Sequence, residues 1–338
     1  MRGKAEWDCG PGGNGAWSGM PPQSRYPLIF NPKARSQRGR RALRFLMEQA
    51  NQFVLYATKH SGEARELAAR FAAAGEPVVI AAGGDGTVNE VVGGLAGTDT
   101  ALGVLPTGTM NVFARELGLP HEDLAKCFGV IRSGFEREID LFEANGSPFV
   151  QMAGVGFDAK VIEKTTWESK KAFGPLAYLL AGARLLGERP PLLEVVCDDG
   201  RRETGVAVLA GNGALYGGQF RFFHRADNRD SKLDILVYKE AGYKLVLDSL
   251  RGLVQGGIDR VSSAVYLQAE RFTVSAAEPV PVEVDGELLG RFAETRFAPA
   301  ARRLRVIAPE EPVPARSGGF MRSLLGWTRR PAATPANP

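Results

Sequence analysis

Short apolar runs alternate with amphipathic segments through the first third of the chain. The apolar runs have the length of buried strands, and the segments between them repeat apolar residues at the interval of a helix face. The predicted strands are 25–30, 52–57, 77–82 and 101–105, and the helices that follow them begin near 38, 63, 88 and 112. Strands that alternate with helices in this way predict a parallel, doubly wound α/β sheet.

The stretch after the third predicted strand is the clearest candidate site. Gly83, Gly84 and Gly86 surround Asp85, and Thr87 leads into the next helix. Glycines permit close backbone approaches that a Cβ forbids, and a helix N-terminus attracts phosphate. In such a loop a carboxylate binds a metal, accepts a proton or holds the loop by local hydrogen bonds. The alternative is a glycine-rich turn closed by an Asx cap, with no part in catalysis.

The loops after the other predicted strands reach the same edge of a parallel sheet, where open α/β sheets place ligands. Asn31 follows the first strand, although a plain Asn-Pro turn explains it equally well. Ser61 is the predicted N-cap of the second helix, and Gly75 is its stop. The loop 106–111 follows the fourth strand.

After Pro120 the pattern changes to many short runs rich in Val, Ile, Leu and Phe, which predict an antiparallel β-sandwich. The predicted strands are 137–144, 149–152, 192–197, 205–210, 232–238, 264–269, 271–276 and 281–285. Two helices are predicted among them, at 173–186 and 242–254. Residues 1–24 are rich in glycine without periodicity, so we expect a disordered N-terminal extension.

Composition narrows the class of protein. The 338 residues suggest two domains, and 44% hydrophobic residues can build both cores. A net charge of +4 fits acidic surfaces or phosphates, but the chain lacks the dense basic stripe with aromatic residues that nucleic-acid binding requires. Three scattered cysteines suggest a reducing cytoplasm, and three unclustered histidines make a zinc site improbable. No apolar run approaches a membrane span.

The turn from Gly83 to Glu90 (Gly-Gly-Asp-Gly-Thr-Val-Asn-Glu) and the segment from Pro106 to Ala114 (Pro-Thr-Gly-Thr-Met-Asn-Val-Phe-Ala) resemble the diacylglycerol kinase catalytic domain. Bacterial lipid kinases share this domain with sphingosine and ceramide kinases. The similar stretches continue at 139–141, 153–158, 211–213, 216–218 and 285–287, so the resemblance covers roughly residues 26–309. Gly93 and Val112 depart from it, because the family often has Asn and usually has Asp at these positions.

The resemblance implies an α/β ATP-binding catalytic domain over residues 25–135, to which a final strand within about 296–309 returns. It also implies a β-sandwich domain for the lipid acceptor over residues 136–295. Residues 310–338 then form a flexible tail, in which large apolar residues and arginines mix between 320 and 330. Such a tail could rest on an anionic membrane, and a short helix packed on the body is an equally good explanation.

The resemblance also implies the residues that bind the nucleotide, with ATP and Mg²⁺ as cofactors. The expected ATP-binding residues are Asn31, Lys33, Thr58, Gly83, Gly84, Asp85, Gly86, Thr87, Asn89, Glu90 and Thr109. Phosphoryl transfer to an alcohol needs such a phosphate cradle, a divalent ion and a base aligned with the hydroxyl. The expected catalytic residues are Asp85, Glu287 and Asp285, with Glu287 as the base. From the residues alone, a hairpin turn is the preferred explanation of the Asp-Gly-Glu triplet.

A second loop resembles the magnesium-binding loop of bacterial lipid kinases. By this resemblance Asp230 supplies a carboxylate, and Asp227 and Lys232 supply backbone carbonyls. The glycine that usually follows the aspartate is Ser231 in this chain. A turn rich in Asp and Asn that holds no metal remains the alternative.

The expected function is an ATP-dependent lipid kinase that phosphorylates the hydroxyl of a lipid such as diacylglycerol or a sphingoid base. Its expected partners are ATP and a lipid at the inner face of the membrane, and a homodimer stays open. One alternative is a kinase of a soluble acceptor, as in NAD kinases, which share the glycine turn. Another is a protein that binds a nucleotide or lipid without turnover. Apolar pockets discriminate chain shape weakly, so the sequence does not identify the lipid.

Overall fold

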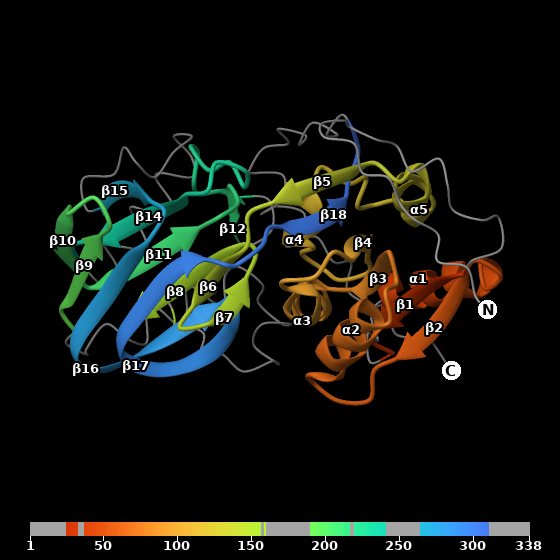
Figure 1. Ribbon diagram of the computed structural model, residues 1–338, viewed down its shortest axis with the longest axis horizontal. Helices are drawn as coiled ribbons and strands as arrows, with labels where there is room; N and C mark the ends of the chain where they lie inside the picture. Colours follow the sequence, from red (N-terminus) through yellow and green to blue (C-terminus); the bar gives the residue numbers. More distant parts are fainter. Residues whose placement is uncertain are drawn as a thin grey trace, which may run out of the picture.

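The computed structural model describes residues 25–32, 37–156, 159, 190–216, 220–240 and 264–310. Two sheets, one in each half of the molecule, organise this part of the chain (Figure 1). The first is six-stranded, in the order β2 (Phe53–Ala57), β1 (Tyr26–Phe30), β3 (Val78–Gly83), β4 (Ala101–Pro106), β18 (Leu304–Ile307) and β5 (Glu136–Ile139). All neighbouring pairs are parallel except β18 with β5.

Helices cover both faces of the first sheet. They are α1 (Gln37–Glu48), α2 (Glu63–Ala73), α3 (Asp85–Leu95), α4 (Val112–Glu116) and α5 (Leu124–Ser133). Side chains alternate between faces along a strand, so Phe53 and Tyr56 of β2 point to opposite faces. Phe53 contacts Phe128 of α5, and Tyr56 contacts Phe71 of α2. The doubly wound architecture predicted from the sequence is therefore confirmed.

The second sheet is antiparallel, and its strands form a sandwich around one apolar core. Its main path is β15 (Ala264–Ala269), β14 (Leu233–Tyr238), β11 (Ala207–Gly211), β8 (Met152–Gly156), β16 (Phe272–Val284), β17 (Glu287–Pro299), β6 (Phe142–Ala144) and β7 (Ser147–Phe149). Two more strands, β9 (Leu193–Cys197) and β10 (Arg202–Gly205), join it through β16, while β12 (Leu215–Tyr216) and β13 (Phe220–Arg221) pair with each other. The early part of β16 pairs with β9 and its end pairs with β8. This long strand therefore links both layers around one apolar core.

The chain crosses between the two domains twice, at neighbouring places (Figure 1). It leaves the first sheet after β5 and returns to it in β18, and Ala300 N–H donates to the Leu141 carbonyl oxygen at 2.8 Å. Arg303 Nε lies 2.8 Å from a carboxylate oxygen of the buried Asp140. These bonds hold the two connections together, which limits how far the domains can separate.

Several local predictions differ from the structure. The predicted strand 137–144 is two strands, and its first part, β5, belongs to the first sheet rather than to the second domain. Predicted strands 271–276 and 281–285 are one strand, because the irregularity between Ser275 and Val280 bends β16 without ending it. Helix α5 and most of β17 were not predicted.

β17 stays in the second sheet to Pro299, so the return to the first sheet begins later than residue 296. The predicted helices 173–186 and 242–254, the N-terminal extension and the tail from 311 onward lie outside the described residues. Within the described ranges no helix is long and apolar enough to span a membrane.

Candidate active site

The turn between β3 and α3 is tightly packed at its glycines. A Cβ on Gly83 would lie 2.3 Å from Thr87 Cβ, so no larger residue fits this position. Gly84 is the N-cap of α3, and the first backbone bond of the helix runs from Val88 N–H to the Gly84 carbonyl oxygen at 3.1 Å. The N–H groups of the first turn precede this ladder and point from the N-terminus, which is a geometry suited to phosphate.

The loop that follows β4 packs against this turn, backbone on backbone. Thr107 N–H donates to the Gly83 carbonyl oxygen at 2.9 Å. A Cβ on Gly108 would lie 2.5 Å from Gly84 Cα. Asn111, buried and with φ of 49°, accepts from Gly108 N–H and donates to the Gly108 carbonyl oxygen, both at 3.0 Å. The two glycine loops therefore form one rigid unit.

Asp85 ties this unit to the start of α4. Its Oδ1 accepts a hydrogen bond from Phe113 N–H at 3.4 Å. Burial raises the pKa of Asp85, and the backbone N–H groups of Phe113 and Val112 oppose this shift. This contact is a local hydrogen bond of the kind that one of the three predicted roles requires, and the other two roles stay predictions.

The β16–β17 hairpin carries the second group of predicted catalytic residues. Asp285 and Gly286 have φ of 49° and 84°, so the turn is a two-residue hairpin in which both residues are left-handed. The Asp285 carboxylate accepts three backbone hydrogen bonds at 2.9 Å, from the N–H groups of Val150, Gln151 and Met152. Burial raises the pKa of Asp285 to about 6 against these bonds, and the nearby Asp85 charge raises it further. Asp285 therefore holds the segment between β7 and β8.

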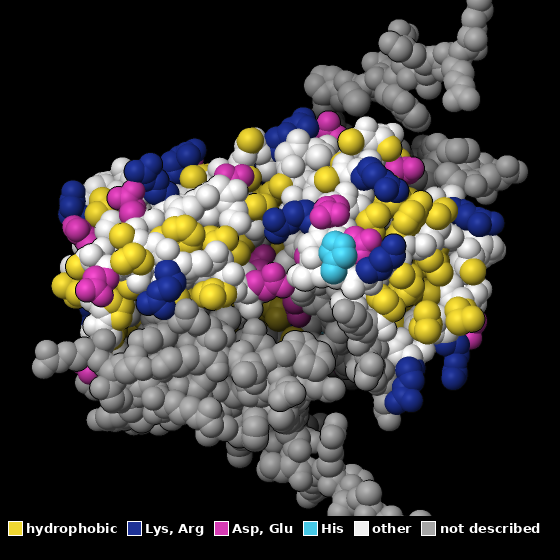
Figure 2. All heavy atoms as spheres, turned by 90° about the horizontal axis from the view of Figure 1, so that it is seen from below, with side chains coloured by type: hydrophobic (Ala, Val, Ile, Leu, Met, Phe, Trp, Pro, Cys, Tyr) yellow, Lys and Arg dark blue, Asp and Glu magenta, His cyan; other side chains and the backbone are white. Residues whose placement is uncertain are grey.

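The hairpin reaches from the second domain to the first turn of α3. Asn89 Nδ2 donates to the Asp285 carbonyl oxygen at 3.1 Å. A Cβ on Gly86 would lie 3.3 Å from Glu287 Oε1, so this carboxylate faces the glycine turn. Figure 2 shows acidic side chains gathered where the two domains meet. The fold thus brings a carboxylate to within a few ångströms of a phosphate-type cradle.

The other predicted ATP-binding residues lie around this edge with different surroundings. Thr58 is buried, and its N–H and hydroxyl both donate to the Phe30 carbonyl oxygen, at 2.9 and 3.4 Å. Asn31 and Thr109 are exposed, directly after β1 and in the loop after β4. Lys33 lies outside the described residues.

Glu90 has a role in the structure that the sequence did not suggest. Its carboxylate accepts from Ala64 N–H at 3.1 Å and from the Ser61 hydroxyl at 3.3 Å. It therefore stabilises the start of α2. The prediction of Ser61 as N-cap was wrong, because Gly62 takes that position with a left-handed φ of 89°.

The loop 227–232 closes on itself through polar contacts. Asp230 N–H donates to the Asp227 carbonyl oxygen at 3.2 Å, and Asp230 Oδ1 accepts from Lys232 N–H at 3.0 Å. Ser231 has φ of 62°, and its N–H donates to Asp140 Oδ2 at 2.6 Å. Among the residues described, no group of three or more His, Cys, Asp or Glu side chains could hold a metal ion.

One polar junction between the domains was missed. Glu116 Oε2, at the end of α4, accepts from Gln151 Nε2 at 3.1 Å and from Leu215 N–H at 2.9 Å. Nothing in the spacing of these residues, which are far apart in the chain, could have indicated the contact.

Comparisons with known proteins agree with this architecture. The model of the diacylglycerol kinase catalytic domain matches residues 25–144, and that of the YegS C-terminal NAD kinase beta sandwich-like domain matches residues 151–308. The chain is 30% identical to a diacylglycerol kinase of Bacillus subtilis over 295 residues, which is 85% of this chain and 97% of that protein. It is also 30% identical to a diacylglycerol kinase of Staphylococcus aureus, over 86% of this chain and 94% of that one.

A solved structure shows the same fold. A diacylglycerol kinase from Bacillus anthracis superposes with a TM-score of 0.69 at 24% identity, over 85% of this chain and 97% of that chain. The two matched domain models, the relatives that align along almost their whole length and the shared two-domain fold lead to one conclusion. The chain belongs to the diacylglycerol kinase family of lipid kinases, and it pairs the catalytic domain of that family with a YegS-type C-terminal domain.

Proposed function

We propose that the protein transfers the γ-phosphate of MgATP to the hydroxyl of a membrane lipid such as diacylglycerol or a sphingoid base. The observation that carries this proposal is the position of Glu287, whose Oε1 would lie 3.3 Å from a Cβ on Gly86. A base beside an anion-binding helix terminus is the pairing that phosphoryl transfer to an alcohol requires. A module that only binds a nucleotide has no need of this carboxylate.

In the proposed reaction, the N–H groups of the glycine turn hold the phosphates of ATP. A Glu287 carboxylate oxygen accepts the proton of the lipid hydroxyl while the hydroxyl oxygen forms a bond to the γ-phosphorus. The bond from that phosphorus to the bridging β,γ-oxygen breaks, and ADP leaves. A hydroxyl loses its proton late in a loose transition state, so the placement of Glu287 matters more than a strongly shifted pKa.

Asp285 and Asp85 act in this proposal through the backbone. Asp285 fixes the 150–152 segment through three hydrogen bonds and, through its carbonyl, contacts α3. Asp85 fixes α4 against the glycine turn. In this proposal both residues are positioning residues: they hold the β16–β17 hairpin and the glycine turn in place relative to each other.

The loop 227–232 stays a proposal for a structural Mg²⁺ site. Its candidate donors are the Asp230 carboxylate and the carbonyls of Asp227 and Lys232, which are the oxygen ligands that Mg²⁺ prefers. When bound, the ion would add charge neutralisation and rigidity there. A carboxylate can accept several hydrogen bonds or metal contacts, and the bond from Lys232 N–H uses only one of these positions on Asp230.

The test is transfer of labelled phosphate from ATP across diacylglycerol, monoacylglycerol, sphingosine, ceramide and undecaprenol, with NAD as the soluble acceptor. We expect one lipid class to be labelled, and kcat on it to fall by roughly 10²–10⁴ in Glu287→Gln with little change in ATP affinity. Glu278→Gln is the matched control, because Glu278 is an exposed glutamate of β16. Labelling of NAD alone, or full activity of Glu287→Gln, would refute the proposal.

A further inference from the structure

Helix α1 has an unusual outer face. Its inner side is apolar, with Ala42 and Leu46 buried. Arg40, Leu43, Arg44 and Met47 lie at the spacing i, i+3, i+4 and i+7, and all four are exposed. Arginine and large apolar side chains therefore alternate along one stripe that faces solvent.

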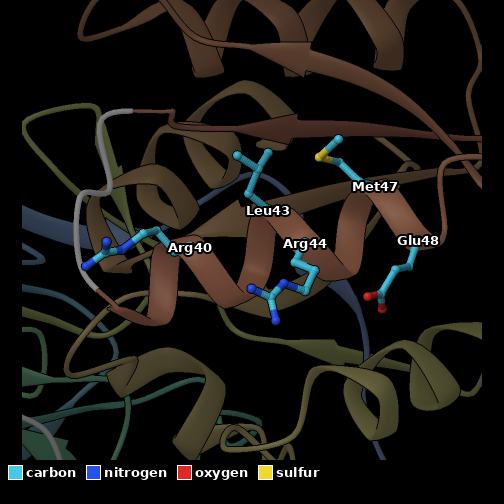
Figure 3. Close-up of a pocket in the computed structure, with 5 residues that line it drawn as sticks. All are labelled: Arg40, Leu43, Arg44, Met47 and Glu48. Atoms are coloured by element: carbon cyan, nitrogen blue, oxygen red, sulfur yellow. The ribbon is translucent and has the colours of Figure 1, made fainter.

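The large apolar residues of this stripe are well exposed. Leu43 is 47% and Met47 is 67% exposed. Figure 3 shows Leu43 and Met47 along one border of this outer face, and Arg44 and Glu48 along the other border. The five residues Arg40, Leu43, Arg44, Met47 and Glu48 line one open depression.

The neighbouring edge strand extends the apolar surface. β2 lies at the edge of the first sheet, and Leu55 is 37% exposed. Leu55 is two residues from Phe53, which contacts Phe128 of α5, so Leu55 points to the face of the sheet that carries α5. Helix α1 also lies on this face, since Phe45 contacts Phe128. We call Arg40, Leu43, Arg44, Met47 and Leu55 the α1–β2 surface.

Exposed apolar residues are concentrated at this place. Six large hydrophobic residues are exposed in the described part of the chain, and three of them, Leu43, Met47 and Leu55, belong to the α1–β2 surface. A fourth, Val54, is in β2 but points to the opposite face of the sheet. Figure 2 shows hydrophobic side chains gathered at the outer end of the first domain, with Lys and Arg at their border. Exposed apolar groups that cluster in this way mark an interaction site.

The charge of this segment indicates the kind of partner. Between residues 33 and 47 the chain has six Lys and Arg and no Asp or Glu. In an isologous contact between two copies, the same basic segment would meet itself, which is unfavourable. An anionic phospholipid surface complements both features, because apolar side chains enter the headgroup boundary and arginine side chains reach the phosphates.

We propose that the α1–β2 surface docks the protein onto an anionic phospholipid bilayer. The proposal rests on the proposed function, since a kinase whose acceptor is a membrane lipid works at the bilayer. Leu43, Met47 and Leu55 contact the acyl boundary, and Arg40 and Arg44 contact lipid phosphates. The residues of this site lie between positions 40 and 55, within the first domain.

The experiment measures binding of the full chain to sedimented vesicles of phosphatidylcholine, with and without one third phosphatidylglycerol. Arg40→Gln/Arg44→Gln should weaken binding to the anionic vesicles by roughly 20- to 30-fold, because each arginine near such a surface is worth about fivefold in affinity. The matched control is Arg201→Gln/Arg202→Gln, which removes the same charge from exposed positions of the second domain. It should change binding less than about threefold.

A second pair of variants tests the apolar contribution. Met47→Ser should weaken binding about tenfold, whereas Leu192→Ser, at a residue 69% exposed compared with 67% for Met47, should have little effect. The unfolding temperatures of Arg40→Gln/Arg44→Gln and Met47→Ser should match that of the wild type, since these side chains are already exposed.

The outcomes separate docking from catalysis. Phosphorylation of a lipid dispersed in detergent should be the same in Met47→Ser and wild type, and a wild type that binds vesicles but labels no lipid would refute only the proposed function. Docking by this surface is overturned if each surface variant binds the anionic vesicles as tightly as its matched control does. It is also overturned if deletion of residues 316–338 alone abolishes binding. It is also overturned if Met47→Ser changes a dimer into a monomer in sedimentation, which would make the surface a contact between copies.

Discussion

A methyl group at Gly108 tests whether the two glycine loops act as one unit. In Gly108→Ala the new Cβ would lie 2.5 Å from Gly84 Cα and 2.8 Å from Asn111 Oδ1. The first of these atoms belongs to the backbone, so it cannot rotate away as a flexible side chain would. The loop 106–111 must therefore move away from the turn between β3 and α3.

The size of the effect follows from this geometry. Since carbon atoms in ordinary contact lie at least about 3.4 Å apart, the two backbones must separate by about 0.9 Å. Overpacking of this kind costs roughly 1–3 kcal/mol of unfolding free energy. The same shift stretches the hydrogen bond from Thr107 N–H to the Gly83 carbonyl oxygen, now 2.9 Å, beyond its useful range. We expect ATP affinity to fall by about tenfold or more, because one hydrogen bond to a charged group such as a phosphate contributes at least about that factor to affinity.

The matched control is Gly129→Ala, the same change inside α5, where a Cβ meets no atom within 4 Å. Alanine there should stabilise the helix by about 0.5–1 kcal/mol and leave ATP affinity unchanged. Urea unfolding gives the first quantity and titration calorimetry with MgATP gives the second. If the two variants have equal stability and equal ATP affinity, the loops do not depend on each other and the reasoning is refuted.

Three further predictions concern carboxylates. Asp85→Asn should reduce transfer to below about 1% of wild type while the fold survives; near-normal turnover of the purified variant would remove this loop from catalysis. In Asp230→Asn, Mg²⁺ should no longer raise the melting temperature, whereas Asp199→Asn, in an exposed turn, should keep this response; a metal effect that persists in Asp230→Asn would exclude the site. Burial raises the pKa of Asp234 and of Asp285 to about 6. A raised carboxyl pKa means that the folded state binds more protons, so the unfolding free energy should fall as pH rises from about 4 to 6, by roughly 1–3 kcal/mol per group. Asp234→Asn should flatten part of this slope in urea unfolding at each pH, and an unchanged slope would contradict the burial argument.

The strands and helices of the first domain could be predicted because each buries one recognisable apolar pattern. Val88, Val91, Val92 and Leu95 recur on one face of α3, and all four are buried. The long β16–β17 hairpin of the second domain was harder to predict from the sequence, because exposed residues occur at irregular positions along both strands. Periodicity fails where a strand bends or leaves one layer for the other.

The sequence by itself determined the two-domain fold, the glycine turn and the triplet at 285–287, because these depend on local spacing and on backbone angles that few residues accept. Only the tertiary structure decided what each carboxylate touches. Asp285 accepts hydrogen bonds from N–H groups of residues 133 to 135 positions away, and Glu90 caps a helix that precedes it. The two domains meet through Asn89 and the hairpin, contacts that no spacing encodes. A hydrogen bond forms where folding brings a donor to an acceptor, so it depends on packing rather than on distance along the chain.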